Sequence, residues 1–122
     1  YLYNYLTKDN KILCKDWFKD ALYFDYDGFG IVQRDDNLWN FIKTDGTYLS
    51  DMWFGNVGRF INGLANVYLK NGHKNYLRTD GTLLVDDLEC NLEISYYKRD
   101  KINVWKNGRI IYNINRNGER VD

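Results

Sequence analysis

The chain has 122 residues, and its 17 Lys and Arg balance its 17 Asp and Glu, so that the formal net charge is zero. This balance argues against binding to nucleic acid or to an acidic membrane, since both usually require an excess of basic residues. The length fits one domain that spans residues 1–122. The sequence contains no run of ~18 apolar residues, the length that a membrane-spanning helix requires. No export signal is visible in this segment. We therefore expect a soluble protein without nucleic-acid or membrane partners.

The remaining composition predicts strands and tight turns. The chain has no proline and is rich in aromatic residues, with 11 Tyr, 6 Phe and 4 Trp. Aromatic residues favour strands, whereas Asn, Asp and Gly favour tight turns. The two cysteines, Cys14 and Cys90, are too few for a disulfide scaffold and lack the C-x-x-C spacing of zinc ligands, so we expect free thiols. The composition favours an all-β fold.

One short motif returns along the whole chain. Its copies are Asn4–Asn10, Asn40–Gly46, Asn75–Gly81 and a more divergent Tyr112–Gly118. The last residues of the copies lie at positions 10, 46, 81 and 118, so that successive copies are 36, 35 and 37 residues apart. Such a fixed period is typical of repeat proteins. We divide the chain into units at residues 1–27 (partial), 28–62, 63–98 and 99–122 (partial).

Each unit is predicted to be a three-stranded antiparallel meander of ~36 residues. In the clearest copy, residues 64–69, 74–78 and 82–85 form the first, second and third strands. Asn71-Gly72 and Asp80-Gly81 separate these strands, and both dipeptides suit the positive φ angles of a type I′ turn. Further turns of this kind are expected at Asp45-Gly46 and Asn107-Gly108.

A lone three-stranded meander buries too little surface to be stable, so we expect stacked units that share a core. The alternation of Ala65, Val67 and Leu69 indicates that each sheet has one buried face. The chain begins with Tyr1, not Met, and its first and last units are partial, which indicates a segment of a longer chain with an unpaired edge at each end. We expect at least one end to be completed by the parent chain, by another subunit, or by the two ends meeting in a closed, propeller- or barrel-like arrangement.

The repeat resembles a known family. Phe60–Val67, Lys70-Asn71-Gly72 and Asn75–Gly81 together are similar to the WG-repeat family of β repeats. The Trp-Gly pair of that family is replaced by Trp39-Asn40 and, more weakly, by Lys74-Asn75. These Asn variants, with an Asp-x-Trp-Phe segment after the third strand, resemble the form common in gut Bacteroidales and their phages.

The resemblance covers nearly the whole chain and weakens in the last unit. There Leu88-Glu89 stands in the Trp-Phe place, and Arg99-Asp100-Lys101 stands in the place of Gly-Leu-Ala. The resemblance implies an all-β array without catalysis, and it assigns no ligand. The likeness to phage copies implies, as one concrete form, a bacteriophage protein associated with the virion.

No residue set in the sequence predicts a metal site or a cofactor. His73 is the only histidine and follows the Asn71-Gly72 turn, where exposed polar residues are expected. Asp25-Tyr26-Asp27-Gly28 is similar to the start of a calcium loop, but such a loop needs an oxygen ligand at its fifth position and Glu at its twelfth. Phe29 and Asp36 occupy these positions. We therefore expect neither zinc nor calcium to bind.

The glycine and carboxylate pairs also favour structural roles. Gly28-Phe29-Gly30 and Gly55–Gly58 lack the following helix and the Lys-Ser/Thr of a phosphate-binding loop. Asp35-Asp36 lies in an expected turn, and Asp86-Asp87 lies at the end of an expected strand. General acid catalysis needs one carboxyl that is desolvated and held near its partner. We therefore expect no catalytic residues, and a protein that is not an enzyme.

Aromatic side chains are the remaining candidates for binding. Trp17 and Trp53 recur with the repeat, which favours packing between units over a ledge for a glycan or peptide. Tyr96-Tyr97, with Lys98 and Arg99, interrupts the repeat pattern and is a better place for specificity, although the pattern favours a plain surface strand even there. The sequence thus favours a non-catalytic structural or protein–protein interaction module, bound to another protein or to neighbouring parts of its own chain. A carbohydrate- or peptide-binding module is the alternative, and exposure of the rings distinguishes the two.

Overall fold

A computed structural model describes residues 1–122 and shows an all-β chain without helices. Its strands are β1 (Asp20–Leu22), β2 (Gly30–Gln33), β3 (Trp39–Ile42), β4 (Asn56–Ile61), β5 (Leu64–Tyr68), β6 (Lys74–Arg78), β7 (Asn91–Ile94), β8 (Ile102–Lys106), β9 (Arg109–Ile114) and β10 (Arg120–Val121). They form three antiparallel sheets in the orders β1-β2-β3, β4-β5-β6 and β10-β9-β8-β7. The expected all-β class of successive antiparallel meanders is confirmed.

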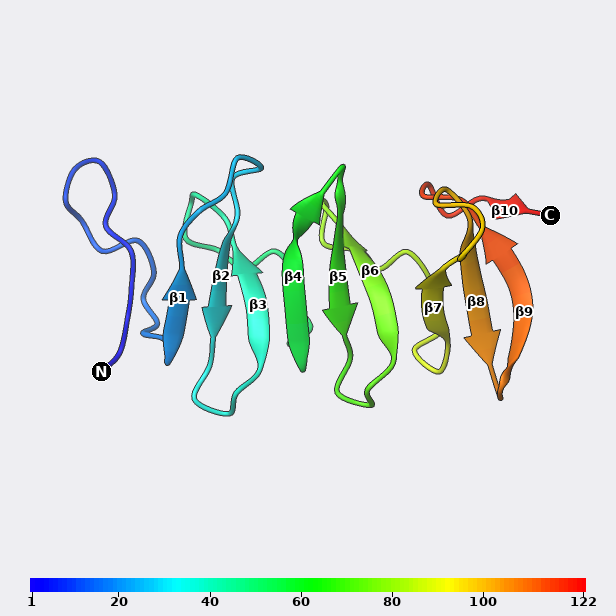
Figure 1. Cartoon of the computed structure of the whole chain (residues 1–122). Helices are drawn as coiled ribbons and strands as arrows, with labels where there is room; N and C mark the ends of the chain where they lie inside the picture. The colour runs from blue at the N-terminus through cyan, green and yellow to red at the C-terminus, as the bar shows by residue number, and fades with distance from the viewer.

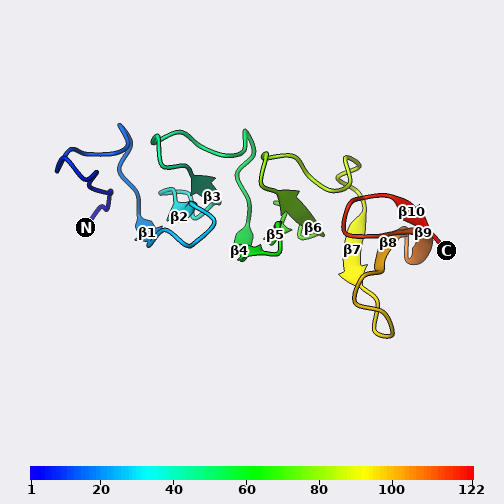
Figure 2. The same ribbon diagram turned by 90° about the horizontal axis from the view of Figure 1, so that it is seen from above.

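The sheets follow one another in an open row. Figure 1 shows them side by side in chain order, with the two termini at opposite ends of the row. Figure 2 shows the segments that connect β3 to β4 and β6 to β7 on the same side of the sheets. The alternative of a closed ring is therefore wrong for this chain, because the first and last strands do not pair. The structure contains no helix of the length and apolarity that crossing a membrane requires.

The strands are grouped differently from the expected meander. The expected third strand, residues 82–85, pairs with β6 only through the bridge between Leu77 and Leu83. The strand that completes each three-stranded unit precedes the other two strands in the chain. In the second sheet, for example, this strand is β4, which lies within the expected connection and pairs with β5. The units are therefore β1–β3, β4–β6 and β7–β9, each preceded by an irregular connecting segment.

A buried asparagine explains why the connecting segment leaves the sheet so soon. Asn40 in β3 donates from Nδ2 to the carbonyl of Ser50 (2.9 Å) and accepts a bond from the N–H of Phe41 (2.7 Å). These side-chain bonds satisfy backbone groups that a neighbouring strand would otherwise satisfy. The equivalent Nδ2 bonds join Asn4 to the carbonyl of Cys14 (2.7 Å) and Asn75 to the carbonyl of Val85 (2.9 Å).

The turns are of two kinds, so the expected type I′ geometry holds only in part. It occurs at Asn107-Gly108, and also at Asn62-Gly63, because both residues of each pair have positive φ. At Asp80-Gly81 only the glycine has a positive φ, and the N–H of Gly81 bonds the carbonyl of Arg78 (3.0 Å) in a three-residue loop. Asp80 Oδ1 accepts a bond from the N–H of Thr82 (2.9 Å), which leaves the left-handed conformation to the glycine. Asp45-Gly46 and Asn71-Gly72 follow the same pattern.

The core lies between units and not inside them. We define seam 1 as the boundary between residues 1–18 and the first sheet, seam 2 as that between the first and second sheets, and seam 3 as that between the second and third sheets. One buried cluster occupies each seam. At seam 2, for example, Phe60 of β4 packs against Phe29 and Phe41 of the first unit, with ring centroids 4.8 and 5.0 Å apart.

Both faces of the first and second sheets are covered, so the expectation of a single buried face is wrong for these two sheets and holds only for the third, whose buried apolar residues all belong to the cluster at seam 3. The neighbouring residues Phe41 and Ile42 point to opposite faces of β3, and both are fully buried. Phe41 belongs to the cluster at seam 2 and Ile42 to the cluster at seam 1. The alternation of apolar residues therefore distributes side chains between two seams.

Seam 3 departs from the other two where the sequence departs from the repeat. Phe18 and Phe54 form backbone bridges with Tyr3 and Trp39. The equivalent of these phenylalanines is Glu89, which makes no such bridge. The N–H of Lys74 is bonded instead by Oδ1 of Asn91 (2.7 Å). The last unit, where the resemblance to the repeat weakens, is thus joined to the second sheet by a side-chain bond in place of the backbone bridge.

Candidate functional site

Hollows open at all three seams along one edge of the array, the lower edge in Figure 1. At this edge, the turns after β2, β5 and β8 lie beside the segments that lead into β1, β4 and β7. We name the hollows after one lining residue each: the Trp17 hollow at seam 1, the Met52 hollow at seam 2 and the Trp105 hollow at seam 3. Their volumes are about 370, 530 and 380 Å³.

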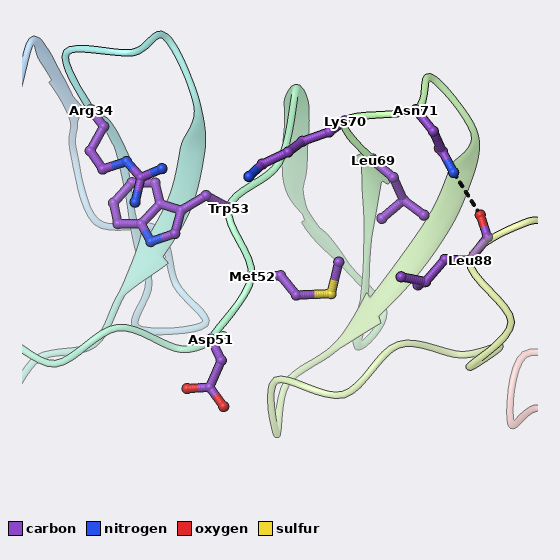
Figure 3. A pocket seen from close by; sticks show the side chains of 8 residues that line it. All are labelled: Arg34, Asp51, Met52, Trp53, Leu69, Lys70, Asn71 and Leu88. Carbon is purple, nitrogen blue, oxygen red and sulfur yellow. Dashed lines mark hydrogen bonds between the residues drawn. The ribbon is translucent and has the colours of Figure 1, made fainter.

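The Met52 hollow combines an apolar floor with charged sides. Figure 3 shows its lining residues, Arg34, Asp51, Met52, Trp53, Leu69, Lys70, Asn71 and Leu88. Met52, Leu69 and Leu88 form the floor, Arg34 and Lys70 lie on one side and Asp51 lies on the other. Lys70 forms no ion pair and extends toward the Trp53 side of the hollow. The arrangement can hold an apolar side chain on the floor and a carboxylate at the cationic side.

Arg34 is held in place by two neighbours. Its guanidinium lies 4.2 Å from the centroid of the Trp53 ring, as Figure 3 shows, and its Nη2 lies 2.7 Å from Oδ2 of Asp36. The bond from Arg34 lowers the pKa of Asp36, which therefore stays ionised. Trp53 itself packs edge-to-face on Tyr48, with centroids 5.0 Å apart. Because Arg34 covers one face of Trp53, that ring is a packing element and not an open platform.

The Trp17 hollow adjoins the Met52 hollow, since Arg34 and Trp53 line both. Trp17 is 52% exposed, in contrast to Trp53. Tyr48 donates from its hydroxyl to Oδ2 of Asp16 (2.6 Å), and burial together with this bond raises the pKa of Tyr48. The expected inter-unit packing role thus describes Trp53, whereas Trp17 presents an open indole.

The Trp105 hollow contains His73, the only histidine, together with Glu89, Glu93 and Lys106. Lys106 Nζ lies 2.7 Å from Oδ2 of Asp87, and this bond lowers the pKa of that carboxyl. The structure therefore places His73 in a polar hollow among mixed charges. No three His, Cys, Asp or Glu side chains in the chain come together as a metal cluster would require.

The remaining candidates serve local structure. Cys14 and Cys90 are free, buried thiols in different seams, and burial, with Asp87 nearby, raises the pKa of Cys90. Oδ1 of Asp25, in the calcium-like segment, accepts a bond from the N–H of Asp27 (3.0 Å) and thereby closes a turn. Gly28 has a φ of +87° and bends the chain before β2, as its match to Gly63 indicates.

Sequence reasoning missed the cations of the lower edge. Arg34, Lys70 and Lys106 recur at intervals of 36 residues (70 − 34 and 106 − 70). Arg34 directly follows β2, Lys70 lies two residues after β5, and Lys106 ends β8. The period would have revealed them, but only the fold shows that they lie beside the connecting segments. The carboxylate pairs Asp35-Asp36 and Asp86-Asp87 are exposed at the same edge and are not brought together.

The aromatic residues do not form one continuous row. Trp17 is exposed, Trp53 is covered by Arg34, and Leu88 occupies the equivalent place at seam 3. Tyr96 and Tyr97 are 92% and 89% exposed, but they belong to the loop after β7, on the other edge of the array. No protein-family model, no curated protein and no solved structure matches this chain.

Proposed function

We propose that the chain is a non-catalytic β-repeat module with a structural or protein–protein interaction role, and that the Met52 hollow docks an extended segment of a partner protein. The proposal is carried by one observation: a hollow recurs at each seam of the lower edge, with different side chains each time. A row of similar but chemically distinct hollows suits an extended polypeptide, because each hollow can select one part of it.

The state of the carboxylate pairs supports a non-catalytic role. Asp36 is ion-paired with Arg34, and Asp87 is ion-paired with Lys106. Both partners lower the pKa of the carboxyl that they contact, so that each carboxylate is kept ionised. A general acid needs the opposite shift, since it must hold its proton near neutral pH.

The test is affinity purification of the protein from its native source together with its partners, comparing two matched variants. Lys70→Glu reverses an unpaired charge in the Met52 hollow, whereas Lys11→Glu reverses an exposed charge in the turn near the N-terminus. We expect Lys70→Glu to reduce recovery of a partner protein and Lys11→Glu to leave it unchanged. Equal recovery from both variants would remove the Met52 hollow from the proposal, and absence of any partner protein would remove the function.

A carbohydrate- or peptide-binding module is the second candidate, and the exposure of Trp17 favours it. An open indole beside a hollow of about 370 Å³ can stack on a sugar ring or on a peptide side chain. Binding to a glycan panel that is lost in Trp17→Ala and retained in Lys70→Glu would favour this candidate over the first.

A further inference from the structure

The upper edge of the array carries a separate hollow near the last unit. The turn between β4 and β5 consists of Asn62 and Gly63 alone, whereas residues 95–101 form a longer loop between β7 and β8. The turn after β9 folds back onto the second sheet, where Arg116 Nη2 donates to the carbonyl of Ile61 (3.2 Å). A hollow of about 480 Å³, which we call the Arg99 hollow, lies among these three segments. The hollow exists because the turn between β4 and β5 is shorter than the loop between β7 and β8 and the turn after β9.

Two arginines give this hollow a positive balance. Arg99 and Arg116 line it together with Asp100, and none of the three takes part in an ion pair. Arg99 is exposed and makes no hydrogen bond, and Arg116 uses only one nitrogen. Two guanidinium groups against one carboxylate leave one positive charge unmatched. Guanidinium groups bind carboxylates through paired, charge-assisted hydrogen bonds.

The loop that carries Arg99 also presents two tyrosines to solvent. Tyr96 and Tyr97 are 92% and 89% exposed, and their rings pack edge-to-face with centroids 5.1 Å apart. Figure 2 shows this loop projecting away from the row of sheets. Exposed aromatic residues beside free arginines have the composition of binding hot spots, because both contribute large contact areas at interfaces.

We propose that the Arg99 hollow binds an extended acidic peptide, with a side-chain carboxylate between Arg99 and Arg116 and a neighbouring apolar residue against Tyr96 and Tyr97. Arg99 and Arg116 are the two cations that line the hollow, and two guanidinium groups fit an isolated carboxylate better than the closely spaced phosphates of nucleic acid, which Asp100 would repel. Lys98 and Lys101 lie in the same loop and add to its attraction for an acidic peptide. The site lies on the opposite edge from the Met52 hollow and does not depend on it.

The test measures binding of fluorescein-labelled peptides in which Glu alternates with Leu or Tyr, each beside a counterpart with Gln in place of Glu. Arg99→Ala removes an exposed side chain that makes no hydrogen bond or ion pair within the chain, so we expect the fold to be retained. Arg109→Ala is the matched control, since it removes an exposed arginine on the lower edge. We expect the Glu peptides to bind and Arg99→Ala to weaken them about tenfold, as for a charge-assisted pair. Tyr97→Ala weakens the same peptides, and Arg109→Ala and Lys70→Glu do not.

Four outcomes would overturn the assignment: no binding of any Glu peptide, equal binding of the Gln peptides, equal loss in Arg99→Ala and Arg109→Ala, or tighter binding of oligo-dT or phosphatidylserine vesicles with the same dependence on Arg99. The last outcome would assign the hollow to nucleic acid or to a lipid surface. If the Glu peptides still bind while Lys70→Glu and Lys11→Glu recover a partner protein equally in the affinity purification, the Arg99 hollow stands and the proposed role of the Met52 hollow does not.

Discussion

Replacing Asn40 by alanine tests whether the side-chain amide holds the connecting segment in place. Asn40 is fully buried, and its loss leaves the carbonyl of Ser50 and the N–H of Phe41 without their partner. A buried polar group without a hydrogen bond costs about 1–3 kcal/mol, so that the two groups together lower the free energy of unfolding by about 2–5 kcal/mol. With a urea m-value of about 2 kcal/mol/M, the midpoint of unfolding falls by about 1–2.5 M. Urea titration followed by tryptophan fluorescence and circular dichroism measures this shift.

Asn4→Ala is the matched control for that experiment. Asn4 makes the equivalent bonds, to the carbonyl of Cys14 (2.7 Å) and from the N–H of Tyr5 (2.7 Å), and also donates to the carbonyl of Asp16 (3.0 Å) and accepts from the N–H of Cys14 (3.3 Å), but it is only partly buried. Water can replace the lost amide there, so the expected loss is below about 1.5 kcal/mol. Equal losses at Asn4 and Asn40, or a loss at Asn40 below about 0.5 kcal/mol, would refute the reasoning.

Three further predictions concern a turn, the alkaline limit and metals. Gly81→Ala should lower the urea midpoint more than Gly72→Ala. Both glycines have positive φ, but only at Gly81 would a Cβ lie 2.2 Å from a backbone oxygen, that of Leu49. Equal midpoints would mean that Leu49 moves aside at little cost. Burial raises the pKa of Tyr5 from 10.0 to about 12, so the stability that this phenol contributes below pH 10 is lost as the pH rises toward 12. Tyr5→Phe should therefore make the alkaline loss of stability less steep in a pH series of melting curves. A chelator should leave the melting temperature unchanged, and a shift of several degrees would contradict the expected absence of zinc and calcium sites.

The sequence was sufficient for the repeat and its turns, but not for the grouping of the strands. Turn positions depend on local chemistry, and pairs such as Asp80-Gly81 carry that chemistry in two residues. Residues 82–85 include three consecutive apolar residues between turn signals, and the sequence therefore predicts a strand there. Their departure from the sheet depends on the bond between Asn75 and Val85. That partner, ten residues along the chain, is not visible in any local pattern.

The candidate sites were predictable to a smaller extent, because they depend on packing between units. The period indicated packing for Trp53, and the structure places it beneath Arg34. No period indicates that Trp17, its repeat equivalent, is open to solvent. The Arg99 hollow depends on the hydrogen bond between Arg116 and the carbonyl of Ile61, which lie 55 residues apart in the sequence. No sequence pattern predicts this contact.

The position of the core clusters makes stability a property of neighbouring units. Each cluster draws residues from both sides of a seam, so that a unit cut away from its neighbours would keep its hairpins and lose its core. In such a system the folding free energy grows by one coupling term with each added unit, and unfolding begins where a unit has a neighbour on one side only. Amide exchange should therefore be slowest in β2, β3, β5 and β6, which belong to the sheets with a neighbour on each side, and faster toward residues 1–18 and β10. The array would fray from its ends, while its middle persists as the last cooperative segment.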